Sequence, residues 1–114
     1  MKKYLFHFLI LCLLFSCSKT EVKIPEGVLS KNEMALLLTD VNIAQAAVAN
    51  YSSGDTVKFS MADYLPEILS IHHITPLQYD SSITFYSRHP ELMSEIYDNV
   101  ITELSKKQSE VSAH

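Results

Sequence analysis

A leader at the start of the chain places the tightest limit on what the rest can fold into. Lys2 and Lys3 form a short positive segment, and an apolar run from Tyr4 to Phe15, interrupted only by His7, follows it. As a helix, this run would reach about 18 Å, against roughly 30 Å for the hydrocarbon core of a membrane. The run therefore predicts a cleaved signal peptide, residues 1–16, rather than a permanent span. Of the 114 residues, 98 then remain, which is enough for one small domain.

The leader ends in a motif that resembles the lipobox of bacterial lipoproteins, with Leu14, Phe15 and Ser16 before Cys17. Thioether diacylation requires a thiol at the first mature position, and the peptidase requires a small side chain before it. The motif therefore predicts a lipid anchor at Cys17, which two or more acyl chains would make stable. The alternative is an ordinary secreted protein in which this cysteine stands by chance.

Cysteine and charge counts narrow the classes of fold and partner. Cys12 is lost with the leader and Cys17 is consumed by lipid, so no disulfide can form within the mature domain. Stability must then come from core packing, which favours a helical, locally connected design. After the loss of Lys2 and Lys3, seven basic residues remain against thirteen acidic ones. This balance argues against a nucleic-acid partner, which would need clustered Lys and Arg.

The first predicted helix follows a polar segment. Residues 17–29 are typical of a lipidated N-terminus and a flexible tether, which would keep the domain close to the bilayer. Ser30 and Glu33 then form a capping-box pattern. Apolar residues recur after it at three- and four-residue spacing as far as about Asn50, which indicates an amphipathic helix. This main stripe consists of Met34, Leu37, Leu38, Val41, Ala44 and Val48.

Three later helices are marked by their start signals. Ser60 followed by Asp63 offers the first of these, but Pro66 fits only the first turn, so this helix should begin near Asp63 or be kinked. Residues 75–78, Thr-Pro-Leu-Gln, combine an N-cap, a proline at the first helical position and a glutamine that closes the box. Residues 89–91, His-Pro-Glu, begin the last helix.

Together these signals predict an all-α fold. We expect a small antiparallel array of about four helices over residues 30–106, around one core. Residues 107–114 are expected to form a frayed tail. No segment alternates apolar and polar residues as a half-buried strand would, and the whole chain contains two glycines.

Several short motifs occur in a recognisable order between residues 23 and 105. They are Pro25, Met34-x-x-Leu37-Leu38-x-Asp40, the histidines that end the second helix, Asp80-Ser81-Ser82 with Tyr86, His89-Pro90-Glu91, and Ile96-Tyr97-Asp98-x-Val100. This order resembles the family named domain of unknown function 4296, which consists of short lipoproteins of Bacteroidota. The resemblance implies a lipoprotein with a helical domain, and it implies no activity, since none is established for the family.

The residues after Cys17 bear on location. In such bacteria, sorting to the cell surface is associated with an acidic run directly after the lipidated cysteine. Residues 18–21 hold one acid and one base. We therefore expect a lipid-anchored protein of the outer membrane that faces the periplasm, with the cell surface as the alternative.

A group of histidines could be drawn as a metal site, together with one acid: His72, His73, His89 and Asp80. Adjacent histidines on a helix point about 100° apart, whereas helical ligand pairs are usually three or four residues apart. We therefore expect no metal and no cofactor, with His72 packed near the core and His73 and His89 at helix ends.

The candidate ligand region is a set of polar and aromatic side chains on and after the third helix: Tyr79, Asp80, Tyr86 and His89. Tyrosines could stack on a sugar or an aromatic ligand, but at helical spacing they are usually core residues. Ser81 and Ser82 lack a nucleophile elbow or an oxyanion loop, so we expect them on the exposed side of the helix. The sequence predicts that the protein is not an enzyme.

The first predicted helix is apolar on two faces. At 100° per residue, further apolar residues lie together on a second face of the helix, about 130° around its axis from the main stripe. Asp40 lies between the two faces. The candidate interaction face is therefore Leu36, Asp40, Ile43 and Ala47. A helix that is apolar on more than one side is central in its bundle or meets a partner, here an envelope protein or a second copy of the chain.

Two classes of function remain. The favoured one is a lipid-anchored cell-envelope protein that serves as a non-catalytic interaction or scaffolding module. The alternative is a small-ligand-binding or hydrolytic accessory lipoprotein that uses the candidate ligand region. Shape discriminates between them, because the alternative needs a concave pocket where those groups converge and the favoured class needs an exposed apolar patch.

Overall fold

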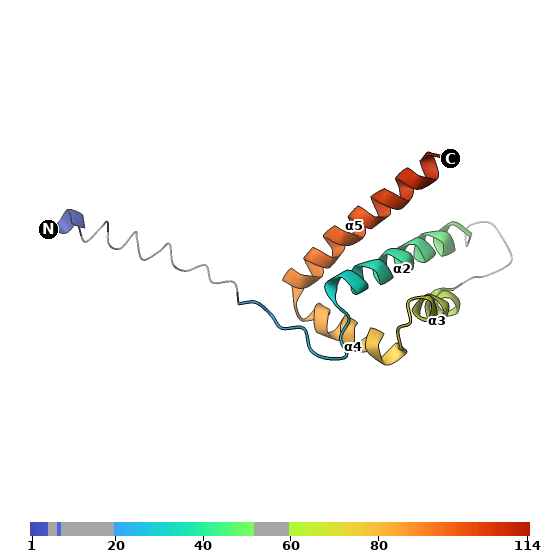
Figure 1. Ribbon diagram of the computed structural model, residues 1–114, viewed down its shortest axis with the longest axis horizontal. Coiled ribbons are helices and arrows are strands. Elements are labelled where there is room, and N and C mark those ends of the chain that lie inside the picture. The colour runs from blue at the N-terminus through green and yellow to red at the C-terminus, as the bar shows by residue number, and fades with distance from the viewer. Residues whose placement is uncertain (5–6, 8–19, 52–59) are drawn as a thin grey trace.

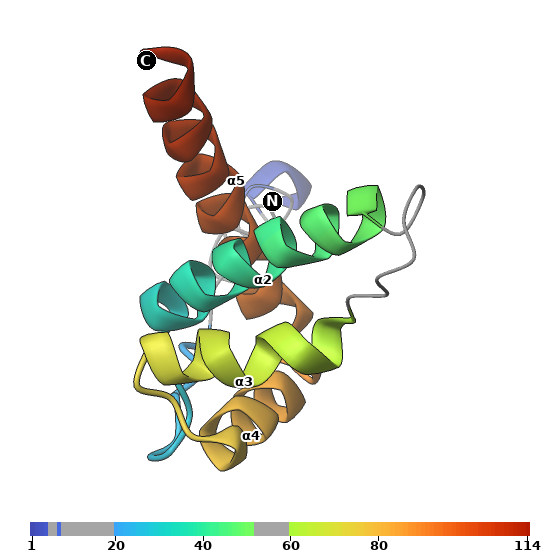
Figure 2. The same cartoon turned by 90° about the vertical axis from the view of Figure 1, so that its right-hand side faces the viewer.

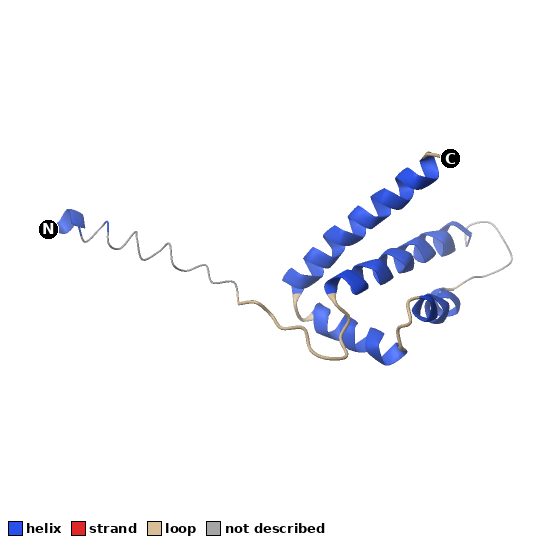
Figure 3. Ribbon diagram, in the orientation of Figure 1, coloured by secondary structure: helices blue, strands red, loops and turns tan. Residues whose placement is uncertain are grey.

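The computed structural model describes residues 1–4, 7, 20–51 and 60–114, in which four helices form the folded domain (Figure 1). They are α2 (Lys31–Tyr51), α3 (Met61–Ile71), α4 (Pro76–Ser87) and α5 (Pro90–Ser112). Figure 3 shows helices and loops, and no strand, in the described part of the chain. The prediction of an all-α fold is confirmed. The predicted lipobox, with Cys17, lies outside the described residues.

Side chains at the starts of α2 and α4 form the two capping boxes that the sequence predicts. Glu33 Oε2 accepts a hydrogen bond from the Ser30 N–H at 2.9 Å, and the Glu33 N–H donates to Ser30 Oγ at 3.2 Å. At α4, Gln78 Oε1 accepts from the Thr75 N–H at 3.0 Å, and the Gln78 N–H donates to Thr75 Oγ1 at 3.1 Å. These bonds satisfy amides at and just inside each N-terminus, so both starts are fixed locally.

α3 begins two residues before the position expected from its proline. Asp63 Oδ2 accepts from the Ser60 N–H at 3.0 Å, so Ser60 is the N-cap and Met61 is the first helical residue. Pro66 therefore lies inside the helix, where it has no N–H to donate to the carbonyl of Ala62. The start signal at Ser60 and Asp63 sets the boundary in spite of this missing hydrogen bond.

α2 is the helix around which the others are arranged. It packs against both α3 and α5, and α4 contacts α3 and α5 (Figure 2). Buried apolar side chains from all four helices and from the segment before α2 form one core: Leu29, Met34, Ala35, Leu37, Leu38, Val41, Ile68, Leu69, Tyr86, Ile96 and Val100. Most of the main stripe predicted for the first helix thus faces this core: four of its six residues are buried in it, and Ala44 packs against it.

α2 and α5 run in the same direction, which corrects the predicted antiparallel array (Figure 1). Lys31, at the start of α2, pairs with Glu95 near the start of α5, and Asp40 further along α2 pairs with Lys107 further along α5. Strict up-and-down order would make the fourth helix run opposite to the first. Here α3 is seen end-on in Figure 1 while α2 is seen from the side, so these two cross at an angle. α4 then returns the chain to the end of the bundle where α2 begins.

The peptide groups of Leu29, two residues before the start of α2, are bound by two side chains of α4. The Leu29 N–H donates to Ser82 Oγ at 2.9 Å, and the Leu29 carbonyl accepts from the Tyr86 hydroxyl at 2.6 Å. Ser82 and Tyr86 are four residues apart and therefore lie on one face of α4. Both are fully buried. An apolar residue can be buried here because its backbone donor and acceptor both find partners.

The segment that carries Leu29 is part of the domain. Ile24 and Val28 are half-buried and pack against the core. The tether predicted over residues 17–29 is therefore too long, and residues 24–29, hereafter the docked segment, belong to the fold. The segment looks polar in the sequence because Pro25, Glu26 and Gly27 make its exposed turn, while the apolar residues on either side turn inward.

The C-terminal ends of α5 and α3 are formed in different ways. α5 continues to Ser112, so the prediction of a frayed tail from residue 107 is wrong. Neither Gly nor Pro interrupts this stretch, and the helix therefore continues. α3 instead ends at Ile71, and the chain turns sharply at His73, whose φ is 56°. The Ile74 N–H donates to the Leu69 carbonyl at 2.9 Å and the His73 N–H to the Ser70 carbonyl at 3.1 Å, which together make a Schellman motif.

Candidate functional site

The predicted interaction face of α2 lies at the surface. Leu36 and Ile43 keep 40% and 42% of their surface exposed, although α2 is central to the array. Ala47, one turn further along, is half-buried. The neighbouring helices therefore do not enclose this face. Leu36 and Ile43, which precede and follow Asp40 along the helix, are hereafter called the α2 strip.

Asp40, within this face, joins three helices. Its Oδ2 is 2.8 Å from His72 Nε2, at the end of α3, and its Oδ1 accepts from Lys107 Nζ of α5 at 2.7 Å. Because a carboxylate only accepts, His72 must carry a proton on Nε2. Partial burial by itself would raise the pKa of the Asp40 carboxyl, but the hydrogen bonds from Lys107 and His72 outweigh burial and hold that pKa below its usual value. Asp40 is thus an ionised link between α2, α3 and α5.

The structure separates the four residues of the candidate ligand region. Tyr86 is fully buried, and its hydroxyl is used by Leu29. Burial also raises the pKa of the Tyr86 phenol. Tyr79 is half-buried, and its pKa is raised by burial first and then by the nearby charge of Asp80. Tyr86 is therefore a core residue and not part of a ligand surface. Asp80 and His89, in contrast, line one groove.

This groove, hereafter the α4 groove, lies between the docked segment and α4. It has a volume of about 470 Å³ and is lined by Pro25, Val28, Asp80, Ser81, Thr84, Phe85, Arg88 and His89. His89 Nδ1 donates to the Phe85 carbonyl at 2.7 Å, and the two rings stack with centroids 4.3 Å apart. The imidazole is therefore held in one orientation.

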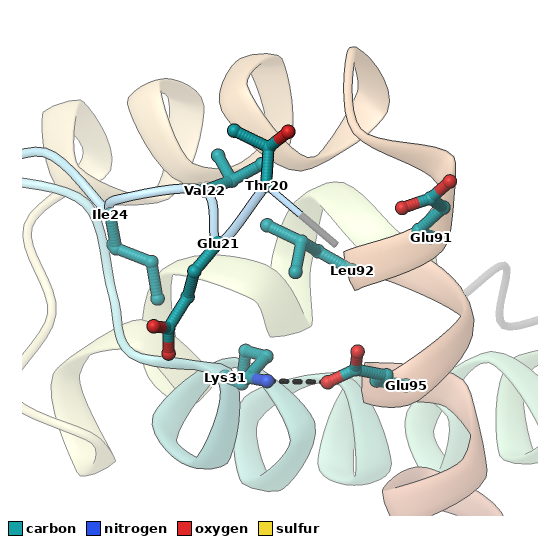
Figure 4. Close-up of a pocket in the computed structure, with 8 residues that line it drawn as sticks. All are labelled: Thr20, Glu21, Val22, Ile24, Lys31, Glu91, Leu92 and Glu95. Carbon is teal, nitrogen blue, oxygen red and sulfur yellow. Dashed lines mark hydrogen bonds and ion pairs between the residues drawn. The ribbon is translucent and has the colours of Figure 1, made fainter. Parts of the chain in front are cut away.

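A second hollow lies where the chain enters the domain (Figure 4). Residues 20–24 run over it, and its other walls come from the starts of α2 and α5. Lys31 and Glu95 pair across it, and Glu21 lies on the same side as Lys31. Val22, Ile24 and Leu92 contribute apolar side chains to its walls. The hollow thus marks the junction between the N-terminal segment and the helices.

Neither a metal centre nor a membrane span is formed by the described residues. No group of three or more His, Cys, Asp or Glu side chains within them has the arrangement of a metal site. His72 is bonded to Asp40, and His89 is bonded to the backbone of α4. Among the described helices, none is long and apolar enough to cross a bilayer.

Sequence reasoning missed the residues that fix the docked segment. Ser82 was expected on the exposed side of α4, but it is fully buried. Its Oγ accepts from Leu29 and donates to the Gln78 carbonyl at 2.6 Å, so a small polar residue is accommodated in the core. The spacing of Ser82 and Tyr86 on one helix face was the available signal. Nothing in the sequence connects that face with Leu29, more than fifty residues earlier.

The fold and these surfaces define a class of protein: a small all-helical domain whose central helix exposes apolar side chains and whose N-terminal segment is fixed into the core. The chain belongs to the family described as Domain of unknown function (DUF4296), whose model matches residues 25–110. The match begins in the docked segment and ends within α5. It therefore confirms the resemblance seen in the motifs. No curated protein and no solved structure matches the chain.

Proposed function

We propose that this protein is a lipid-anchored protein of the cell envelope that binds another protein through the α2 strip. The observation that carries the proposal is the exposure of Leu36 and Ile43 on the central helix of the domain. Exposed apolar side chains that share one face of a helix are typical of contact surfaces between proteins. The leader and the cysteine at position 17 support the membrane part of the proposal.

Contacts within the domain fix the part of α2 that carries the strip, without any partner. Asp40, between Leu36 and Ile43, is tied to α3 through His72 and to α5 through Lys107. A partner would therefore meet a surface whose backbone is already ordered, and binding would cost little conformational entropy. This arrangement suits a scaffolding role, in which a fixed surface is presented to a second protein.

The docked segment sets the distance from the membrane. If lipid is attached at Cys17, residues 18–23 are the linker before Ile24, where packing against the core begins. Six residues reach at most about 20 Å even when fully extended. The strip residues lie about 8 and 18 Å along α2 from its first residue, at about 1.5 Å per residue. A partner would thus be met close to the bilayer surface.

Site-specific photocrosslinking in intact cells tests the protein-binding part. A photoreactive amino acid at position 36 or 43 should give one discrete adduct. The same amino acid at Gln45, which is exposed on the opposite side of α2 from Leu36, should not. An adduct of twice the chain's mass would identify the partner as a second copy. If positions 36, 43 and 45 give the same diffuse products, the strip is not a contact surface.

The membrane part is tested separately by mass spectrometry of the native protein. We expect a diacylglyceryl group, or that group with a further amide-linked acyl chain, on Cys17. Cys17→Ala should abolish both processing and membrane association. A Cys17→Ala variant that remains processed and membrane-bound would contradict the lipid anchor while leaving the crosslinking result intact.

A further inference from the structure

The α4 groove has an acid at one end and bases at the other. Asp80, Thr84 and Arg88 follow one another at four-residue intervals and therefore lie on one face of α4. Eight residues of helix separate Asp80 from Arg88, which corresponds to about 12 Å along the axis. His89 lies beside Arg88 at the same end.

Both charged side chains are available to a ligand. Asp80 and Arg88 are exposed, and neither forms an ion pair or a side-chain hydrogen bond with another described residue. Asp40, by contrast, is bound on both carboxylate oxygens. The charges of the groove thus play no part in holding the helices together.

His89 adds an imidazole nitrogen of fixed orientation to the basic end of the groove. Its Nδ1 carries a proton because it donates to the Phe85 carbonyl. Nε2 is therefore the acceptor of the neutral ring, and it becomes a donor when the ring is protonated. Stacking on Phe85 fixes the plane of the ring. A carboxylate at this end could meet Arg88 and the protonated His89 together.

Between the two ends the groove is mainly apolar. Its apolar lining comes from Pro25 and Val28 of the docked segment and from Phe85 of α4. Ser81 and Thr84 add hydroxyl groups along α4. An occupant that matches this surface has apolar groups in its middle and opposite charges at its ends.

We infer that the α4 groove binds a short extended peptide with a free carboxyl terminus. The carboxylate lies at Arg88 and His89, the ammonium group lies at Asp80, and apolar side chains rest on Phe85 and Val28. At about 3.3 Å per residue, the 12 Å between the two ends corresponds to about four residues. This groove shares no residue with the α2 strip, so the inference does not depend on the proposed function.

Calorimetric titration of the full-length protein in detergent micelles with the tetrapeptide Ala-Leu-Val-Leu tests the inference. The peptide with both ends free should bind saturably. Amidation of its carboxyl terminus or acetylation of its amino terminus should each weaken binding about two- to fivefold, as expected for one partly exposed ion pair.

Single substitutions then assign each peptide end to its residue. In Arg88→Gln, amidation should weaken binding less than in the unchanged protein, because only His89 then remains at the carboxylate, while acetylation should still weaken binding. In Asp80→Asn, the free and acetylated peptides should bind equally, while amidation should still weaken binding. Both residues are exposed, so these variants should fold, which circular dichroism would verify. Lys106→Gln and Asp98→Asn, on α5, are the matched controls and should leave every titration unchanged.

Several results would overturn the inference. One is the absence of saturable binding by the free tetrapeptide at millimolar concentration. Another is binding that ignores amidation and acetylation, which would indicate apolar association alone. If Arg88→Gln removed the effect of acetylation, or Asp80→Asn the effect of amidation, the assigned direction of the peptide would be incorrect. An equal effect in the α5 controls would show that net charge, rather than the groove, decides affinity.

Discussion

At Leu29 the chain is bound through its peptide groups rather than through its side chain alone. Ser82 accepts from the N–H and Tyr86 donates to the carbonyl, and all three residues are buried. Leu29 also precedes the N-cap Ser30, and Met34 at the fourth helical position belongs to the same core cluster. This is the placement of a hydrophobic staple. One residue therefore fixes how the docked segment enters α2.

Removing the hydroxyl of Tyr86 tests this interaction. Tyr86→Phe should lower the free energy of unfolding by about 1–3 kcal/mol, because the buried Leu29 carbonyl loses its donor. Urea denaturation monitored by circular dichroism measures the change. Tyr97→Phe is the control, since Tyr97 is 47% exposed and its loss of a hydroxyl should have little effect. Equal changes in both variants would show that the Leu29 bond is not important for stability.

His73 is held in the left-handed region, which a glycine adopts without strain. His73→Gly should therefore raise the free energy of unfolding by about 0.5–1 kcal/mol, after the greater freedom of glycine in the unfolded chain is subtracted. Ser70→Gly, in the helical part of α3, should instead lower it by about 0.5 kcal/mol. A loss of stability in His73→Gly would mean that its side chain contributes more than its backbone strain costs.

At the scale of the helices, the N-termini of α2 and α4 were predictable because their capping interactions are local in sequence. The boxes at Ser30 and Thr75 depend on residues three positions apart, so they can be read from short stretches of sequence. The grouping of Leu36 and Ile43 on one face of α2 was also predictable, because helical geometry alone places them together. Their exposure was not, since a helix that is apolar on two sides can equally be enclosed by its neighbours. The direction of α5 was not, since it depends on how α3 crosses α2, and a stripe of apolar residues does not specify a crossing angle. The partners of Asp40 were missed for the same reason.

The link at Asp40 predicts a specific pH dependence. The pKa of this carboxyl is lower in the folded protein than its usual value of 3.8. Its contribution to stability is therefore complete above that value and is lost as the pH falls through the lower, folded pKa. Asp40→Asn should lower stability near neutral pH and reduce its decline in acid, as measured by urea denaturation across an acid series. Asp98→Asn should leave the slope of that decline unchanged, because Asp98 is exposed. An unchanged slope in Asp40→Asn would contradict the link.

At the scale of the whole molecule, the docked segment, residues 24–29, is part of the folded domain. Leu29→Ala should lower the free energy of unfolding by about 2–5 kcal/mol, as expected for a buried leucine. Val22→Ala should cost much less, because Val22 is 37% exposed and precedes the segment. Urea denaturation compares the two. If both variants lose the same small amount, residues 24–29 would be a tether after all.

The bonding of Leu29 has a mechanical consequence. A tension applied to the chain at its N-terminal end would reach the domain through residues 24–29. It would then load the two hydrogen bonds to Ser82 and Tyr86 before the first turn of α2. The N-terminal end of the chain and the core are thus connected in series, and a pull strong enough to free Leu29 from α4 would begin to unravel the helix that carries Leu36 and Ile43.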